Sequence, residues 1–351
     1  MKIIDAYLFR AILSGSALAL LVLGLLDWVF GFLTQMNHAG VGFGRSLLLS
    51  IYTEPRRLYE LFPSAVLIGS LLSLGNLAAN SELIAMRAAG VSIGGVIRAV
   101  LRAGVLMMLF AIAFGEWLVP AGERLAQSML LQAKAGSSVA TQGQNVWAKD
   151  GNEYIHISRV IGKQLLNGIT IYAVKSDNRL HSITHATTAS YRNDRWVLKQ
   201  VVITRFANGK ITLERPQQIV QAQLVNPDLF GFLNTRPEDM SAMELFQYMS
   251  YLRANNLDDS RYALAFWQRL ATPLSALVML ILAVPFAFGS LRTGGGGQRL
   301  FVGVILGVGF YFGNQLITRV GLIYGVPPFF SAFVPLLLVG LLSLAILARI
   351  R

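Results

Sequence analysis

The sequence predicts an α-helical integral membrane protein with six transmembrane helices and an all-β domain of the sandwich or jellyroll type inserted between helices three and four. Three observations predict this fold class. Apolar residues make up 54% of the 351 residues and charged residues only 14%, well below the roughly one quarter that is usual in soluble domains. Six stretches are apolar over the ~20 residues that a bilayer-crossing helix needs. Between residues 121 and 261, charged residues and short alternating strands replace these stretches.

The N-terminal half contains three of the predicted spans and a carboxylate within the first of them. The spans are Ile12–Gln35, Leu61–Ala79 and a stretch from about Val96 to Leu118. Asp27 lies within the first span. A carboxylate in a membrane segment normally faces protein or a water-filled cavity, so we expect Asp27 to point away from lipid.

A short polar-tipped segment, Asn80–Ser92, separates the second span from the third. It is too short and too polar to cross a bilayer, so we expect it to lie at the membrane surface. Ser81 is of a residue type that is preferred at a helix N-cap, and Glu82 follows in the first turn, where a carboxylate suits the helix dipole. Gly90 is a suitable helix stop.

The same segment also offers an apolar ridge, because Leu83, Met86 and Ala89 are spaced three apart. One interpretation is a docking helix that presents Glu82 and this ridge to a partner in water. The alternative is a simple connector between two spans. The predicted docking residues are Ser81, Glu82, Leu83, Met86, Arg87, Ala89 and Gly90.

The middle region alternates short β-rich runs with turn residues such as Asp150-Gly151 and Asn208-Gly209, a spacing that is typical of a small β-sandwich or jellyroll. A helix-like stretch precedes the strands, and a capping box formed by Ser241 and Glu244 opens an amphipathic helix after them. The predicted strands are Asn145–Lys149, Glu153–Val160, Ile169–Val174, Ser182–Arg192, Trp196–Phe206, Ile211–Glu214 and Gln217–Val225.

Three further spans close the chain: Tyr262–Ser290, Leu300–Leu322 and Pro328–Leu347. The predicted domain division is therefore 1–120, 121–261 and 262–351. The fifth span has glycines four apart, at Gly303/Gly307 and Gly309/Gly313. This spacing permits close helix packing, although simple flexibility is an alternative.

The placement of Lys and Arg predicts the orientation of the chain. If both ends lie inside, the four inner segments hold nine Lys or Arg residues against Asp5 and Glu82. The β domain is then outside, and the Asn80–Ser92 segment faces the cytoplasm. The nine residues are Lys2, Arg10, Arg87, Arg98, Arg102, Arg292, Arg299, Arg349 and Arg351.

Several function classes find no support in the sequence. The glycine run at Gly294–Gly297 is not followed by Lys and Ser or Thr, so it is not a phosphate-binding loop. Cysteine is absent, and His181 and His185 have no third metal ligand nearby. The sequence therefore predicts no cofactor, no metal site and no enzyme. Any nucleotide energy must come from another subunit, and nucleic acid is not an expected partner because no basic tract is interleaved with aromatic residues.

Basic side chains gather where the predicted spans reach the outer surface. Interfacial anchoring explains any one of them. Arg319 fits that explanation least, because Gln315 and Thr318 lie in the same span, and a polar stripe on an apolar helix usually faces a cavity. Basic groups around an apolar cavity would suit an amphiphile with anionic head groups and acyl chains. The predicted lipid-binding residues are Trp28, Phe32, His38, Arg56, Arg57, Phe62, Arg124, Lys134, Gln315 and Arg319.

Five stretches, in the same order along nearly the whole chain, carry a family resemblance. The chain resembles the YjgP/YjgQ (LptF/LptG) permeases of lipopolysaccharide export and looks most like their G-type subunit. The matching stretches are Asn80–Ser92, Gly115–Pro120, Val146–Gly151, Phe286–Arg292 and Tyr324–Pro328.

The resemblance implies six spans and a periplasmic jellyroll between the third and fourth, in the bacterial inner membrane. It also implies a heterodimer with an F-type permease (LptF) on a cytoplasmic ATPase dimer (LptB), and a single-span periplasmic protein (LptC) beside the first helix. Residues 81–90 would be the coupling helix that docks into the ATPase, with Glu82 at its acidic position.

The chain departs from the family pattern at several basic positions. Gly31, Asn37 and His38 stand where the family often carries lysines, whereas Arg56 matches a basic family position. After the third span, Gln127 and Leu130 replace two arginines, and Arg124 and Lys134 lie about one turn away.

We therefore expect a permease that extracts lipopolysaccharide from the outer leaflet of the inner membrane and passes it through its β domain toward the outer membrane. Two alternatives stay open. One is a membrane scaffold whose β domain recruits envelope partners without handling lipid, and the weaker one is a membrane-embedded lipid-modifying enzyme.

Overall fold

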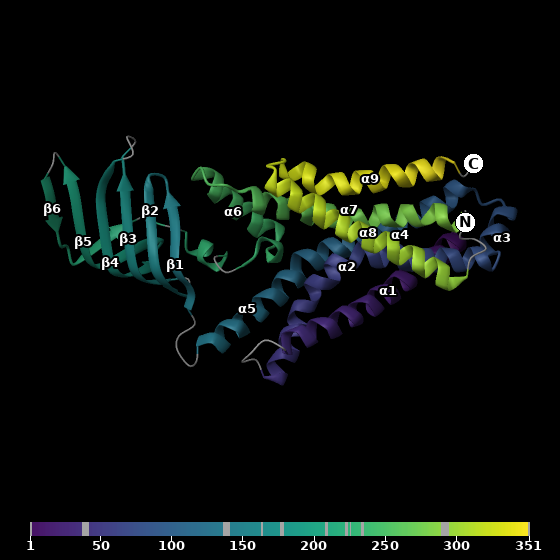
Figure 1. The fold of residues 1–351 in the computed structure, drawn as a ribbon, viewed down its shortest axis with the longest axis horizontal. Coiled ribbons are helices and arrows are strands. Elements are labelled where there is room, and N and C mark those ends of the chain that lie inside the picture. Colours follow the sequence, from purple (N-terminus) through teal and green to yellow (C-terminus); the bar gives the residue numbers. More distant parts are fainter. Residues whose placement is uncertain are drawn as a thin grey trace. The chain divides into compact units, whose positions relative to one another are not determined.

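The computed structural model describes residues 2–36, 42–135, 141–162, 164–175, 179–207, 210–221, 224, 226–232, 235–288 and 295–349 (Figure 1). The chain divides into two compact units. The helical unit comprises Met1–Ala126, Ser241–Phe246 and Ser260–Arg351, and the β unit comprises Gln127–Met240 and Gln247–Asp259.

In the described part of the chain, six helices are long and apolar enough to cross a membrane, and an antiparallel β-sheet lies in sequence between the third and the fourth. The predicted fold class is confirmed. The helices are α1 (Lys2–Met36), α2 (Phe43–Ala79), α3 (Glu82–Ala88), α4 (Ile93–Ala113), the π-helix η1 (Phe114–Leu118), α5 (Val119–Ala135), α6 (Ala242–Ala254), α7 (Ser260–Phe288), α8 (Gly296–Ile323) and α9 (Pro328–Ala348).

Three of the predicted spans have different limits in the structure. The first begins at Lys2, not near Ile12, and the second begins at Phe43, not near Leu61. The third continues from α4 through η1 into α5. The sequence prediction of α2 began too late because charged residues break its apolar pattern. One such pair, Arg56 and Glu60, forms an i,i+4 ion pair of 3.1 Å along α2, an arrangement that supports a helix.

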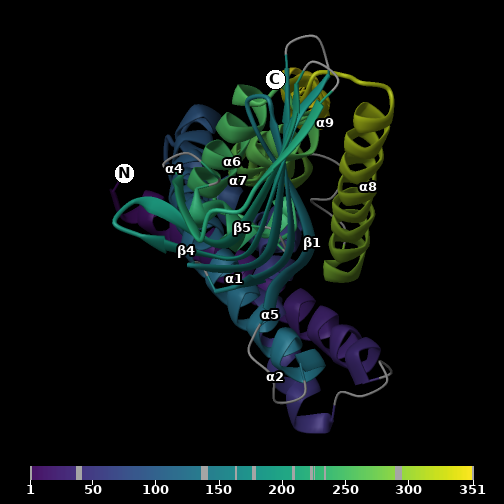
Figure 2. The same cartoon turned by 90° about the vertical axis from the view of Figure 1, so that its left-hand side faces the viewer.

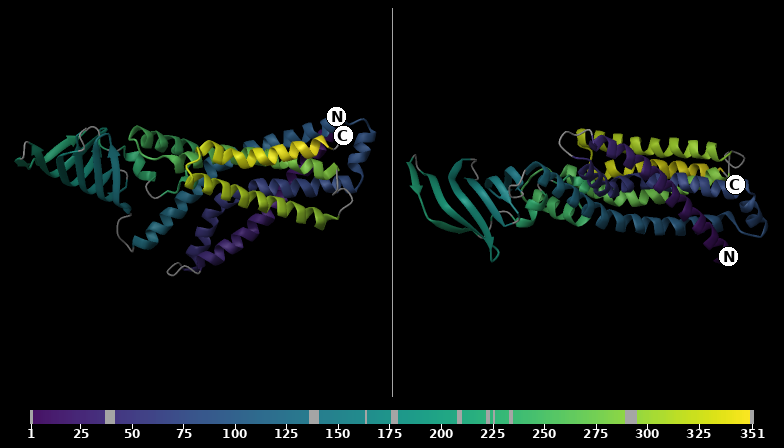
Figure 3. Two further views of the ribbon diagram at one scale, coloured as in Figure 1. Left: turned by 45° about the horizontal axis from the view of Figure 1, so that its top comes forward. Right: turned by 90° about the horizontal axis from the view of Figure 1, so that it is seen from below.

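The central element of the helical unit is α2, which packs against α1, α7 and α8. Leu67, Leu71 and Leu74 are almost completely buried and belong to the largest hydrophobic core, together with residues of α1, α4 and α7. In contrast, α8 stands at the edge of the helical unit (Figure 2) and leaves most of its surface uncovered. The start of α1, the end of α9 and α3 lie at one end of the unit (Figures 1 and 3).

Small residues bring α1 and α8 close to α2. A side chain at Gly69 would overlap the backbone of Gly15 and Ser16 in α1. Gly303 and Gly307 of α8 also lie against α2, as the glycine spacing predicts. The second glycine pair of α8 differs, because an added Cβ at Gly309 or Gly313 meets no described atom within 4 Å.

The π-helix η1 provides partners for two polar groups. Arg269 of α7, which is only 9% exposed, donates a hydrogen bond of 2.6 Å to the carbonyl of Gly115. The Glu116 carboxylate accepts hydrogen bonds from the amides of Ala242 and Met243 at the start of α6, at 2.9 and 3.5 Å. The π turn thus aims one carbonyl and one carboxylate at neighbouring helices.

The β unit contains one antiparallel sheet in which consecutive strands are neighbours in the order β1-β2-β3-β4-β5-β6. The last strand, β7, pairs with the first part of β5, whereas β6 pairs with its last part. The sheet is curved (Figure 3). All seven strands that the sequence predicts are present. They are β1 (Thr141–Asp150), β2 (Glu153–Ile161), β3 (Leu165–Val174), β4 (Leu180–Arg192), β5 (Arg195–Ala207), β6 (Lys210–Glu214) and β7 (Gln218–Gln221).

One face of the sheet forms a second hydrophobic core. Ile157, Ile169 and Leu198 are fully buried there, and Trp196 is 1% exposed. The 3₁₀ helix η2 (Pro227–Phe232) covers this face through Phe230, whose ring meets Trp196 edge-on at 6.0 Å. The face turned away from this core carries exposed side chains such as Arg195 and Lys199.

Replacing Gly69 by Ala should destabilise the helical unit by about 1–3 kcal/mol, because the added methyl group has no room against α1. The measurement is the thermal unfolding midpoint and the yield of monodisperse protein in detergent. Gly309→Ala is the matched control, since its Cβ meets open space. An unfolding midpoint of Gly69→Ala equal to that of the control would contradict the close α1–α2 contact.

Candidate functional site

The short helix α3 lies between two membrane-spanning helices, as predicted, but its N-cap differs from the expectation. Ser81 has left-handed backbone angles (φ 59°), and its side chain makes no capping hydrogen bond. Glu82 does lie in the first turn, and Gly90 follows the helix with φ +90°, a conformation that glycine adopts readily.

The predicted apolar ridge of α3 is wrong for Leu83. Its side chain is 3% exposed and belongs to the core of the helical unit, and Met86 packs partly against the same core. The physical reason is that a seven-residue helix needs an anchor, and Leu83 supplies it. The accessible side of α3 carries Ile84, which is 40% exposed, and Arg87. Ala89 and Gly90 are also exposed.

Two polar contacts that sequence reasoning missed tie α1 to the elements around α3. The hydroxyl of Tyr7 donates a hydrogen bond of 2.8 Å to the Glu82 carboxylate. Arg102 of α4 forms an ion pair of 2.7 Å with Asp5. These residues are far apart in sequence, so no local pattern could have indicated the contacts. Glu82 is therefore part of the helical unit's own hydrogen bonding as well as a candidate docking residue.

A third polar contact of α1 lies toward its other end. Arg57 of α2 forms an ion pair of 3.1 Å with Asp27, and both side chains are about one third exposed. The guanidinium lies over Gly31, where any side chain would overlap it. Twenty residues of helix separate Tyr7 from Asp27, or about 30 Å, which matches the thickness of the hydrocarbon layer. Polar contacts thus hold α1 at both of its ends.

Glu54 is a further polar group at this end, and the sequence analysis did not single it out. Both of its carboxylate oxygens are buried, and neither has a hydrogen-bond partner among the described residues. On α1, an added Cβ at Gly24 would lie 3.6 Å from one of them. Next to it, Gln35 donates a weak hydrogen bond of 3.4 Å to Thr53. Charged and polar side chains therefore cluster between α1 and α2.

Four of the remaining predicted lipid-binding residues have partners within the chain. Arg56 pairs with Glu60 on its own helix, and Arg124 pairs with Glu244 at 2.6 Å. Trp28 stacks on Phe32, with ring centroids 5.9 Å apart.

The other five predicted lipid-binding residues have different outcomes. Phe62 is buried against Phe110, so it is a core residue and not a surface contact for lipid. On α8, Arg319 is exposed and Gln315 half-buried. The predictions for His38 and for the side chain of Lys134 lie outside the described part of the structure.

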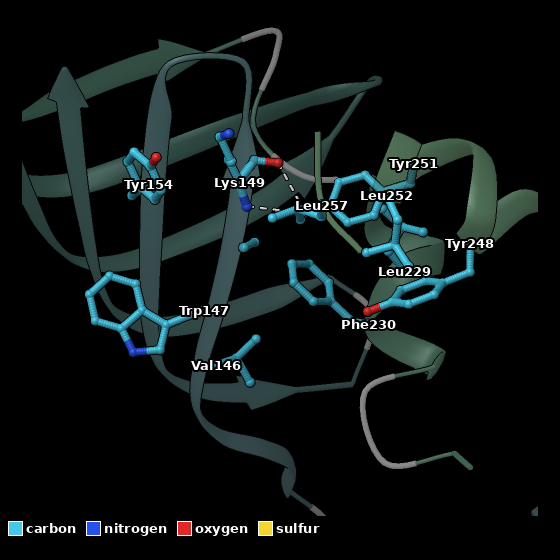
Figure 4. A pocket seen from close by; sticks show the side chains of 11 residues that line it. Val146, Trp147, Lys149, Tyr154, Leu229, Phe230, Tyr248, Tyr251, Leu252 and Leu257 are labelled. Atoms are coloured by element: carbon cyan, nitrogen blue, oxygen red, sulfur yellow. Dashed lines mark hydrogen bonds between the residues drawn. The ribbon is translucent and has the colours of Figure 1, made fainter. Parts of the chain in front are cut away.

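A cavity of about 180 Å³ lies in the β unit beside the edge strand β1 (Figure 4). Trp147, Phe230 and Tyr248 contribute to its mostly apolar lining. Tyr251 of α6 clamps β1 here, because its hydroxyl donates to the Lys149 carbonyl (3.0 Å) and accepts from the Lys149 amide (3.1 Å). Burial raises the pKa of Tyr251, so the hydroxyl keeps the proton that it donates.

A metal centre finds no support in the described residues, which contain no cluster of three or more His, Asp or Glu side chains able to hold an ion. His185 instead shares a hydrogen bond of 3.0 Å with Thr170 on the neighbouring strand.

Comparison with known proteins identifies the family. The model of the lipopolysaccharide export system permease LptF/LptG family matches residues 6–349. The chain belongs to this family. It is 34% identical to the permease protein LptG of Escherichia coli strain K12 over 99% of the chain and 98% of that protein. It is 32% identical to LptG of Haemophilus influenzae over 99% of each. The permease LptF of E. coli matches at 30% identity over 46% of the chain and 45% of its own length.

This family membership and the six apolar helices make the chain a multi-pass inner-membrane protein and a permease of a lipopolysaccharide export system, hence a transport component and not a catalytic enzyme. The near-complete coverage of LptG, against less than half of LptF, places the chain closer to the LptG branch of the LptF/LptG family.

For this LptF/LptG family member we predict that Tyr251→Phe loosens the edge strand β1. The substitution keeps the ring but leaves the amide and the carbonyl of Lys149 without their partner, which should cost about 1–3 kcal/mol. Faster amide exchange in β1 is the expected result. Tyr248→Phe, which lines the same cavity, is the control. Equal exchange in the two variants would contradict the clamp.

Proposed function

We propose that this permease extracts lipopolysaccharide from the outer leaflet of the inner membrane and passes it through its β unit toward the outer membrane. It would act with an F-type permease (LptF), a cytoplasmic ATPase dimer (LptB) and a single-span protein (LptC). The Arg57–Asp27 contact carries this proposal. This contact holds the partly accessible guanidinium group of Arg57. It lies about 30 Å along α1 from the Tyr7–Glu82 contact beside α3.

The two ends of α1 support different steps of this function. Arg57, Arg56 and Arg319 would contact the anionic head group, although exposed ion pairs contribute only about 0–1 kcal/mol each. At the other end, α3 would receive the motion of the ATPase. Since Tyr7 contacts Glu82, a shift of α3 would be felt directly by α1.

The scaffold alternative explains a β domain on a membrane anchor, but it gives no role to charges within the spans. A carboxylate such as that of Glu54, buried without a hydrogen-bond partner among the described residues, is costly to keep in a membrane protein. Such groups are typical of a path for a polar substrate, which favours transport over scaffolding.

To test lipid extraction, a photo-crosslinker at Phe32 should capture lipopolysaccharide in the assembled complex. Arg57→Gln should lower the captured lipid severalfold, because the accessible cation over Gly31 is lost. Arg102→Gln is the matched control, since Arg102 also pairs with an aspartate of α1 but at the other end of the helix. Equal capture in the two variants, or none in the native protein, would count against extraction at this end.

To test coupling, Ile84→Asp should reduce co-purification of the ATPase at least about tenfold, which corresponds to 1.4 kcal/mol of docking free energy. The F-type permease should still co-purify, because the substitution lies on the accessible side of α3. Tyr7→Phe removes the internal hydrogen bond to Glu82 without changing that side, so it should retain the ATPase. If the Ile84→Asp variant retains the ATPase fully, α3 does not dock to the ATPase and is only a connector between two spans.

A further inference from the structure

A hollow of about 550 Å³ lies on the β unit near the β4–β5 hairpin. It is distinct from the cavity beside β1 and shares no residue with it. Three cations line it, Arg192, Arg195 and Lys199, and they are joined by the polar side chains of Ser190 and Gln218. The three cations lie on two neighbouring strands, β4 and β5, and Gln218 belongs to β7.

Strand geometry places these side chains on the accessible face of the sheet. Trp196 and Leu198 of β5 are buried in the core. Successive side chains of a strand point to opposite faces, so Arg195 and Lys199 point to the other face. The register sets Arg192 directly opposite Arg195, and Gln218 of β7 directly opposite Lys199.

The three cations have no carboxylate partner among the described residues. All three are exposed, and none takes part in an ion pair with the described part of the chain. The nearest acidic residue in sequence, Asp194, accepts a hydrogen bond of 3.4 Å from Tyr191. Like charges directly opposite each other on neighbouring strands are destabilising. An anion bound between Arg192 and Arg195 would attract both guanidinium groups and so offset their mutual repulsion.

We propose that this hollow binds the phosphate group of a phosphorylated sugar. Guanidinium groups match phosphate oxygens with two parallel hydrogen bonds, and Lys199 adds a point charge. A phosphate monoester carries about −1.5 to −2 charges at neutral pH, which suits three cations. The volume exceeds that of one phosphate and falls within the roughly 300–1,000 Å³ of small-ligand sites. Ser190, Asn193 and Gln218 can bind sugar hydroxyls.

The source of this sugar phosphate is the head group of the exported lipopolysaccharide, and this part rests on the proposed function. An acidic protein partner fits less well. Among the eight described residues that line it, two are apolar, Val197 and Val220, and none is aromatic, whereas protein interfaces have an apolar or aromatic centre. The hollow is therefore a contact point for the polar part of the lipid on the face of the sheet opposite the hydrophobic core.

The first experiment titrates full-length protein in detergent with glucosamine 6-phosphate, and with glucosamine as the probe that lacks the phosphate group, by isothermal titration calorimetry at constant ionic strength. The phosphorylated sugar should bind, and glucosamine should bind at least tenfold more weakly. The triple variant Arg192→Gln/Arg195→Gln/Lys199→Gln should lose at least tenfold in affinity. The control Arg159→Gln/Lys210→Gln/Arg215→Gln removes three exposed cations elsewhere on the β unit and should bind normally.

Folding and binding are separated by the unfolding midpoint. Because the triple variant removes like-charge repulsion, its midpoint without ligand should be equal to or above that of the native protein. Equal affinity for both sugars, no loss of affinity in the triple variant, or the same loss in the control would overturn the site. Binding of inorganic phosphate as tight as that of the sugar phosphate would restrict it to a simple anion site and overturn the sugar assignment.

The second experiment identifies the source. A photo-crosslinker at Val197 in the assembled complex should capture lipopolysaccharide, and capture should fall severalfold in the triple variant. Capture at Phe32 should stay unchanged in that variant, because extraction precedes contact with the β unit. If the native complex captures lipopolysaccharide at Phe32 but not at Val197, the lipid source is overturned and extraction is left intact. If it captures lipopolysaccharide at neither position, the proposed function is overturned. Capture of a protein at Val197 would show that the ligand is an acidic protein partner and not the lipid.

Discussion

The close approach of α1 to α2 is the constraint on which the helical unit depends. At Gly15 and Gly69 the two backbones are in direct contact, which leaves no room for a side chain. Lipid tails are as apolar as leucine, so helices in a membrane gain from tight packing more than from burial. The same helix α2 also packs against α7 and α8, and the largest core joins residues of α2 with residues of α1, α4 and α7.

Packing of α1 on α2 also determines where charge can be kept. Both ends of α1 bring an acidic group next to a partner, Asp27 beside Arg57 and Asp5 beside Arg102. In a medium of low dielectric constant, a charge without a partner is expensive. Arg269 follows the same rule inside the bundle, where the carbonyl of Gly115 in the π-helix accepts a hydrogen bond from its guanidinium group. Regular α-helical hydrogen bonding would have occupied that carbonyl, so the π turn and the buried arginine belong together.

The candidate site was predictable where it is local in sequence. The position of α3, its acidic first turn and its glycine stop could all be read from Asn80–Ser92, because helix signals act within a few residues. The burial of Leu83 and the Tyr7–Glu82 hydrogen bond were not predictable, because they depend on which side of α3 meets the bundle. The basic hollow was missed for a similar reason. Its cations look like ordinary surface charges until the strand register places them opposite one another.

By itself the sequence determined the class of the molecule: six apolar spans, seven strands between the third and the fourth, and the capping box that begins α6. Hydrophobic length, alternation of polar and apolar residues, and turn residues are local properties, so they survive without the tertiary structure. Only the tertiary structure decided that α2 begins at Phe43, that Phe62 and Leu83 belong to the core, and that α8 packs through Gly303 and Gly307 but not through Gly309 and Gly313. These outcomes depend on which face of each helix meets a neighbour, and that choice minimises the free energy of the whole bundle and not of any single segment.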